Sequence, residues 1–128
     1  MEPTETTSLG GSGLQVTRLG LGCAALAGLY GDIPRNQAIA VVHRALALGL
    51  NLLDTAPFYG CGKSETHLAE ALSGFDRDQY VLATKVGRLL VASESGEQAT
   101  NHFENPSGLT AVFDFTYDGV MRSLEESL

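Results

Sequence analysis

The feature that most constrains the fold of this chain is a repeat of apolar, strand-like segments separated by helical patterns. The segments begin near residues 19, 51 and 79. They lie about 30 residues apart, which suits a repeated strand–helix unit. Strands that alternate with helices form right-handed crossover units, and these units build a parallel sheet. The sequence therefore predicts an α/β protein in which three strands lie parallel to one another.

Each helical pattern carries signals for where the helix begins or ends. Residues 35–48 have apolar side chains at helical spacing, with Pro34 before the first turn and Gly49 after the last. Ser64 is expected to cap a second helix. Thr116 is expected to cap a third helix, whose apolar face has four members: Val120, Met121, Leu124 and Leu128.

The segments outside these units are predicted to be turns and loops. Residues 1–8 are expected to be a disordered N-terminus, followed by a β-hairpin with its turn at Gly11–Gly13. A long polar loop is expected from Gly87 to Phe115, and loops of such length are usually functional or disordered. No helix stop signal follows the apolar pattern that reaches Leu128. We therefore expect the chain to be the front portion of something longer.

Composition excludes several classes of function. The 128 residues are 44% hydrophobic with a net charge of −7, and the eight Lys and Arg are scattered, so no basic surface for nucleic acid is expected. No apolar run reaches the roughly 20 residues of a membrane span, and the polar, acidic start does not resemble a signal peptide. Cys23 and Cys61 fit no metal-ligand spacing. They favour reduced thiols in a cytoplasmic protein, with a disulfide as the alternative.

Two ionisable residues close otherwise apolar strands. Asp54 ends the second predicted strand and Lys85 ends the third. The carboxyl ends of parallel strands meet on one face, and neighbouring strands lie roughly 5 Å apart. We therefore expect Asp54 and Lys85 to pair, and Tyr59, in the loop after Asp54, to reach Lys85.

These three side chains can supply the proton transfer that is needed to reduce a carbonyl or to oxidise an alcohol. A free Tyr has a pKa of about 10, and a nearby ammonium lowers it. Tyr59 can then exchange a proton with a substrate oxygen, while Asp54 keeps Lys85 charged and oriented. The trio supplies no hydride, so a nicotinamide cofactor is required. The alternative is that all three are ordinary strand-end and loop residues.

The stretch Gly62-Lys63-Ser64 resembles the end of a phosphate-binding P-loop, but the rest of that motif is missing. The motif needs a glycine at position 57, where this chain has Pro57. Because proline lacks the backbone N–H groups that such a loop presents to phosphates, we do not expect a nucleotide-phosphate site here.

Three stretches of the chain resemble the aldo/keto reductase superfamily. "GLNLLDTAPFYGCGKSETHLAEAL" (residues 49–72) resembles the family signature, "VLATKVG" the strand with the catalytic Lys, and "LGLGCAAL" the first barrel strand. The resemblance covers residues 9–128 and implies an incomplete (β/α)8 TIM barrel, truncated after about three βα units. It implies an oxidoreductase that uses NADP or NAD. Asp54, Tyr59 and Lys85 would be three members of its catalytic tetrad, with Tyr59 as general acid/base.

The resemblance also implies which parts of the site lie elsewhere. The fourth tetrad member in the family is a His at the end of the fourth strand, and this chain stops before that strand. None of the three histidines of the chain follows an apolar strand: His43, His67 and His102. Gly22 and Cys23 match first-strand positions that pass near the nicotinamide ribose, and Asp54 is expected to touch that ribose as well.

The final stretch narrows the resemblance to one branch of the family. "VFDFTYDGVMRSLEESL" is similar to dehydrogenases of L-fucose and D-threo-aldoses, to galactose dehydrogenases and to pyridoxal 4-dehydrogenases. The implied substrate is a small carbonyl compound or sugar. Two alternatives stay open: a redox-sensing or regulatory subunit with the same fold, and an inactive truncated fragment. The sequence does not indicate an oligomeric state.

Overall fold

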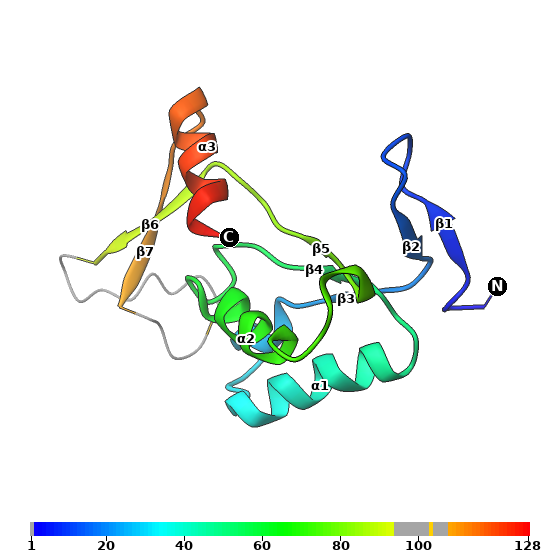
Figure 1. The fold of residues 1–128 in the computed structure, drawn as a ribbon. Helices are drawn as coiled ribbons and strands as arrows, with labels where there is room; N and C mark the ends of the chain where they lie inside the picture. The colour runs from blue at the N-terminus through cyan, green and yellow to red at the C-terminus, as the bar shows by residue number, and fades with distance from the viewer. Residues whose placement is uncertain (1, 94–102, 104–107) are drawn as a thin grey trace.

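The computed structural model of the chain describes residues 2–93, 103 and 108–128 (Figure 1). Short strands and helices follow one another, with two single-turn 3₁₀ helices between them. In chain order the elements are β1 (Thr6–Ser8), β2 (Gln15–Thr17), β3 (Gly20–Gly22), η1 (Ala25–Ala27), α1 (Arg35–Ala47), β4 (Leu52–Asp54), α2 (Lys63–Leu72), η2 (Arg77–Gln79), β5 (Val81–Ala83), β6 (Arg88–Ala92), β7 (Leu109–Phe113) and α3 (Tyr117–Glu126).

A three-stranded parallel sheet forms the centre of the molecule, in the order β3-β4-β5. The register places Leu53 between Leu21 on β3 and Leu82 on β5. Helices α1 and α2 contact each other and lie on the same side of this sheet (Figure 1). The prediction of an α/β protein with a parallel sheet is confirmed.

The core lies between β4 and the two helices that cover it. Leu53 is 0% exposed, whereas its neighbour Leu82 on β5 is 37% exposed. The helices contribute the residues that recur on one face in the sequence, as helical periodicity requires. Eight buried residues make up this cluster: Cys23, Leu26, Ala38, Val42, Leu53, Leu68, Ala71 and Leu72.

The predicted ends of two helices are present. Helix α1 follows Pro34, and Gly49 has a φ of +87°, the left-handed conformation that suits a residue after a helix. Thr116 caps α3, because its Oγ1 accepts a hydrogen bond of 3.1 Å from the backbone N of Gly119. The prediction that Ser64 caps α2 is wrong. Gly62 occupies the cap position, and the Ser64 side chain points into the core instead.

The N-terminal region forms the expected hairpin. Strands β1 and β2 are antiparallel, with Ser8 beside Gln15, and the Gly11–Gly13 segment lies in the connection between them. The structure differs from the disorder expected over residues 1–8, since Thr6–Ser8 form β1. These three residues are exposed, so backbone pairing with β2, and not burial, holds the strand in place.

The expected long polar loop contains a second hairpin, which the prediction missed. Strands β6 and β7 pair antiparallel over their whole length, from Arg88 beside Phe113 to Ala92 beside Leu109. Both segments are apolar and of high strand propensity, but only five residues long, and a polar stretch separates them. The inner residue Leu89 is buried, which explains why the strands form.

Helix α3 lies against β6, but its apolar face is not the buried one. Met121, Leu124 and Leu128 are exposed, and the residues that pack inward are Gly119 and Ser123. Ser123 is held there because its Oγ accepts a hydrogen bond of 2.9 Å from the backbone N of Gly87. No helix in the described part of the chain is long and apolar enough to cross a membrane.

Candidate active site

The two charged strand-end residues meet at the carboxyl edge of the sheet. Asp54 is the last residue of β4, and Lys85 follows β5 by two residues. The Lys85 Nζ lies 3.1 Å from Asp54 Oδ1, 3.0 Å from Asp54 Oδ2 and 2.9 Å from the Thr55 carbonyl oxygen. Both charged side chains are about half exposed, so a ligand can reach the pair.

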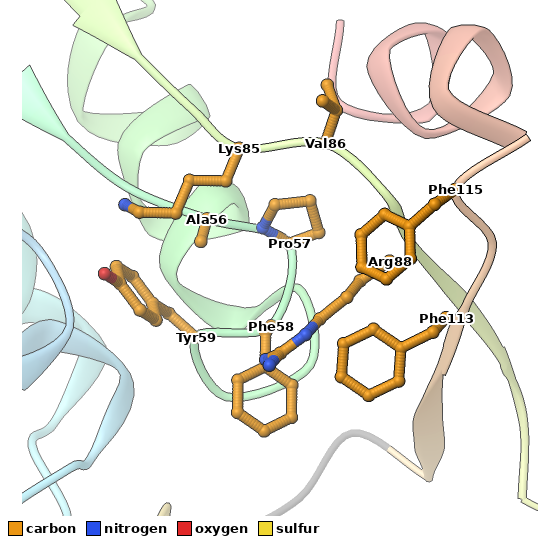
Figure 2. Close-up of a pocket in the computed structure, with 9 residues that line it drawn as sticks. All are labelled: Ala56, Pro57, Phe58, Tyr59, Lys85, Val86, Arg88, Phe113 and Phe115. Carbon is orange, nitrogen blue, oxygen red and sulfur yellow. The ribbon is translucent and has the colours of Figure 1, made fainter. Parts of the chain in front are cut away.

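Tyr59 lies in the turn between β4 and α2 and places its ring beside Lys85. The Lys85 Nζ is 4.8 Å from the centroid of the Tyr59 ring. The Lys85 ammonium and the Tyr59 hydroxyl point to the same side (Figure 2). Partial burial lowers the pKa of Lys85, but hydrogen bonds and charge interactions with Asp54 and Tyr59 outweigh this effect and raise the pKa above its ordinary value. Lys85 therefore stays an ammonium at neutral pH.

The first strand ends beside this trio. Gly22 pairs with Asp54 in the register of β3 and β4, and a Cβ at Gly22 would meet no atom within 4 Å. The surface at Gly22 is therefore open. Cys23, the second expected first-strand residue near the nicotinamide ribose, is 0% exposed. Burial and the nearby Asp54 charge raise the pKa of the Cys23 thiol to about 11. Gly22 and Asp54 remain as the accessible members of the expected cofactor set.

A pocket of about 270 Å³ opens next to Tyr59 and Lys85 (Figure 2). The turn after β4, the strands β6 and β7 and the residues next to these strands supply its walls, which are mainly apolar: Ala56, Pro57, Phe58, Val86, Arg88, Phe113 and Phe115. The guanidinium carbon of Arg88 lies 4.1 Å from the Phe58 ring centroid and 4.7 Å from that of Phe113. These hairpin residues were not predicted from the sequence, although the short apolar runs at residues 88–92 and 109–113 were a usable signal.

The described histidines do not belong to the site. His43 Nε2 lies 2.8 Å from the Ala71 carbonyl oxygen, and His67 Nδ1 lies 3.1 Å from that of Leu26. Each of these histidines joins a helix to a neighbouring segment. His102 lies outside the described residues. Lys63, the lysine of the P-loop-like stretch, forms an ion pair of 3.0 Å with Asp32. Among the residues that the structure describes, no group of three or more His, Cys, Asp and Glu is placed to hold a metal.

The sequence profile of the Aldo/keto reductase family matches residues 18–128, and the chain belongs to this family. Among curated relatives, pyridoxal 4-dehydrogenase of Microbacterium luteolum is 36% identical over 99% of this chain and 40% of its own length. D-threo-aldose 1-dehydrogenase of a Pseudomonas species is 38% identical over 91% of this chain and 36% of its own. L-galactose dehydrogenase of Arabidopsis thaliana is 33% identical over 100% of this chain and 34% of its own length.

Solved structures agree on the fold. An aldo-keto reductase from Bacillus halodurans in its holo form has 30% identity and a TM-score of 0.73, over 97% of this chain and 35% of that one. The glycerol dehydrogenase of Gluconobacter oxydans has 27% identity and a TM-score of 0.71, over 99% of this chain and 36% of that one. The described sheet and helices therefore correspond to part of a (β/α)8 barrel. The chain spans two fifths or less of the length of these relatives.

Proposed function

We propose that the protein transfers a hydride between NADP or NAD and the carbonyl carbon of an aldehyde, ketone or aldose, with Tyr59 as general acid/base. The observation that carries this proposal is the bidentate contact of Lys85 with Asp54 beside the Tyr59 ring. Membership of the aldo/keto reductase family supports it, as do the names of the three relatives, all of which are dehydrogenases.

The three side chains divide the proton chemistry among them. In the direction of carbonyl reduction, the Tyr59 hydroxyl donates its proton to the substrate oxygen as negative charge develops there. The Lys85 ammonium lies 4.8 Å from the ring centroid and stabilises the phenolate that remains. Asp54 accepts two hydrogen bonds from Lys85, and so fixes the ammonium and balances its charge. In the reverse direction the same groups take a proton from an alcohol.

The accessible residues at the ends of β3 and β4 fit a nicotinamide cofactor. Gly22 leaves the surface open at the end of its strand, and the half-exposed Asp54 carboxylate can accept hydrogen bonds from a ribose hydroxyl. These two residues would hold the cofactor on the sheet side of the pocket. When bound, the cofactor supplies the nicotinamide ring that carries the hydride.

The proposed substrate is an aldose similar to L-fucose. The relatives named for D-threo-aldose and L-galactose support a sugar. The pocket of about 270 Å³ is of the size that suits a small ligand, and its aromatic walls can pack against the C–H face of a sugar ring.

The test replaces the hydroxyl of Tyr59. In Tyr59→Phe, turnover of L-fucose or another aldose should fall about 10²- to 10⁴-fold, because the proton donor is lost, while cofactor affinity is retained. Tyr30→Phe is the matched control, since Tyr30 is 88% exposed and is not among the residues that line the pocket. A near-normal rate in Tyr59→Phe would overturn the role of Tyr59. Cofactor binding by the wild-type protein without turnover of any aldose or aldehyde would favour a regulatory subunit.

A further inference from the structure

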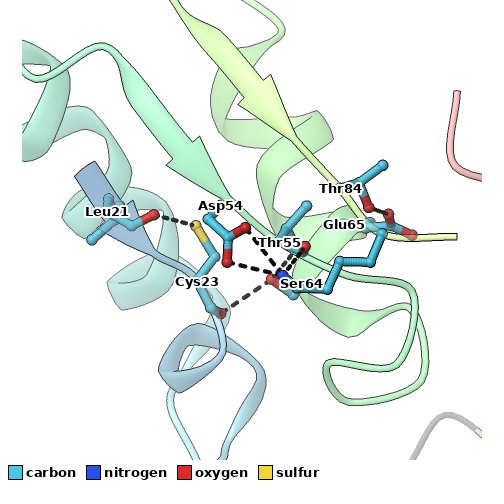
Figure 3. Close-up of polar contacts among 8 residues, drawn as sticks. Leu21, Cys23, Asp54, Thr55, Ser64, Glu65 and Thr84 are labelled. Carbon is cyan, nitrogen blue, oxygen red and sulfur yellow. Dashed lines mark hydrogen bonds and ion pairs between the residues drawn. The ribbon is translucent and has the colours of Figure 1, made fainter. Parts of the chain in front are cut away.

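Two hydroxyl groups lie buried beneath the ion pair of Lys85 and Asp54. Thr55 directly follows β4 and is 1% exposed, and Ser64 lies in the first turn of α2 and is 0% exposed. Their oxygens are 2.8 Å apart. Figure 3 shows both side chains between the strand ends and α2. In the part of the chain that the structure describes, no buried side-chain nitrogen or oxygen lacks a hydrogen-bond partner, so the pair is fully satisfied.

The contacts of Ser64 fix the direction of these hydrogen bonds. Ser64 Oγ donates to the Cys23 carbonyl oxygen over 3.1 Å. A hydroxyl has a single proton, so Ser64 accepts from Thr55 in the other contact. The backbone N–H of Cys23 in turn donates to the Asp54 carbonyl oxygen over 2.8 Å. This hydroxyl relay, from Thr55 through Ser64 to Cys23, joins the ends of β3 and β4 to the start of α2.

Thr55 also touches Lys85 directly, through its backbone. Its N–H donates to the Ala83 carbonyl oxygen over 2.8 Å, and its own carbonyl oxygen accepts from Lys85 Nζ over 2.9 Å. The N–H and the side chain of Thr55 are both hydrogen-bonded, which restricts the backbone rotations that would redirect its carbonyl. A lysine side chain is long and flexible, so a fixed acceptor restricts where its ammonium lies.

We propose that Thr55 and Ser64 are positioning residues: their hydroxyl relay holds the Thr55 carbonyl in the place where it orients the Lys85 ammonium beside Tyr59. The consequence for turnover rests on the proposed function. The orientation of Lys85 does not, because it can be measured without turnover. The competing explanation is that the relay only stabilises the packing of α2 on the sheet.

Isosteric variants separate the two explanations. Thr55→Val removes the hydroxyl and keeps the shape, whereas Thr55→Ser keeps the hydroxyl. Thr66→Val is the matched control on α2, the helix that carries Ser64, because the exposed Thr66 hydroxyl donates to the Gly62 carbonyl oxygen and is not part of the relay. Thr55→Val should lower kcat about 10-fold or more, since small misplacements of reacting groups have effects of this order. Thr55→Ser and Thr66→Val should stay within about twofold of wild type, and Thr55→Val should leave cofactor affinity unchanged.

The pH dependence is the readout that a purely structural role would not move. The titratable groups around Lys85 are Asp54, Tyr59 and Cys23. Weaker contact with the Thr55 carbonyl disfavours the ammonium, so the pKa of Lys85 should fall in Thr55→Val. An NMR titration of Lys85 in protein with ¹⁵N-labelled lysine should show this as a downward shift of its midpoint. In Thr55→Ser the midpoint should match wild type.

The outcomes distinguish a positioning role of the relay from a role in packing alone. An unchanged Lys85 midpoint in a folded Thr55→Val protein would overturn the inference, as would a loss in Thr55→Ser equal to that in Thr55→Val. If the protein turns over no substrate, the proposed function fails, and the NMR titration alone decides the role of the relay. If Thr55→Val does not fold, Ser64→Ala breaks the relay at its middle member, and the same shift of the Lys85 midpoint is expected.

Discussion

Residues 20–85 and the described residues of the later segment, 88–93 and 108–128, contribute side chains to the same pocket, but different kinds of contact stabilise the two regions. The first region packs a parallel sheet against α1 and α2, with the central Leu53 fully buried. The second region is a two-stranded hairpin with α3, and it exposes large apolar side chains such as Phe113 and Phe115. The sheet region carries the Asp54–Lys85 pair and the part of the pocket wall at residues 56–58, whereas the hairpin region adds Arg88, Phe113 and Phe115 to that wall. Under the proposed function, the proton chemistry would take place on the better-packed region, and the less buried region would contact the substrate.

Replacing one cation in each region is the sharpest test of this comparison. Lys85→Met should lower kcat about 10²- to 10³-fold, because it removes preorganised positive charge beside Tyr59. Arg88→Met should leave kcat nearly unchanged. It should raise KM by about 2- to 10-fold, the size of one lost cation–π contact. Steady-state kinetics with one aldose checks both variants. A kcat loss in Arg88→Met as large as that in Lys85→Met would break the comparison.

Core packing gives the second test. Leu53→Ala should lower the free energy of unfolding by about 2–5 kcal/mol, because it leaves a cavity in a fully buried site. Val112→Ala on β7 should cost less than about 1 kcal/mol, since Val112 is 42% exposed. Urea unfolding followed by circular dichroism measures both. Equal losses would mean that the hairpin contributes as much to stability as the sheet does.

Alkaline pH should act on the sheet region through Cys23. Burial raises the pKa of this thiol from 9.0 to about 11, so the folded state favours the protonated form. Its contribution to stability is therefore complete below pH 9.0 and is lost as the pH rises to about 11, with an upper limit of about 2.7 kcal/mol. Unfolding measured at pH 8, 10 and 11 should show this decline. In Cys23→Ala the decline should be smaller, and an equal decline would contradict the assignment.

Acid pH should act weakly on the second region through Asp114. Hydrogen bonds from the Thr116 hydroxyl and backbone hold the pKa of Asp114 below its ordinary value of 3.8. A lowered carboxyl pKa contributes stability that is present above pH 3.8 and is lost as the pH falls through the folded-state pKa. The amide signals of Thr116 and Gly119 should therefore shift below pH 3.8. Asp114→Asn should lack this transition, which NMR can follow.

The sequence predicted the elements whose signals are local and repeated. Periodic apolar residues located α1 and α2, and charges at the ends of apolar strands located Asp54 and Lys85. The hairpin β6–β7 was missed because two five-residue strands are short compared with the polar stretch between them. Ser64 was misread because the hydroxyl that suits a helix cap also suits a buried hydrogen bond, and only the packing of α2 on the strand ends decides between them.

Two further differences between the predicted and the observed structure arise from contacts between segments that are distant in the sequence. β1 is polar and forms through backbone pairing with β2, which side-chain patterns do not report. The apolar face of α3 was correct as a pattern but wrong as a guide to burial, because Gly119 and Ser123 allow the closer approach to β6. The same limit applies to Arg88 in the site, because one of its two aromatic partners, Phe113, lies on β7 and the other, Phe58, lies in the turn after β4.

The ion pair of Lys85 with Asp54 joins residues 31 positions apart in the chain. Contacts of such separation form only after a long loop has closed, which costs entropy before any contact offsets it. A slip of β5 by one residue along β4 would also turn its side chains to the opposite face of the sheet. The pair therefore reports on folding as well as on the proposed proton chemistry: Lys85 meets Asp54 only in molecules whose strands have paired in the correct register. The Lys85 NMR signal used above can consequently serve as a kinetic probe of when the sheet acquires that register during refolding.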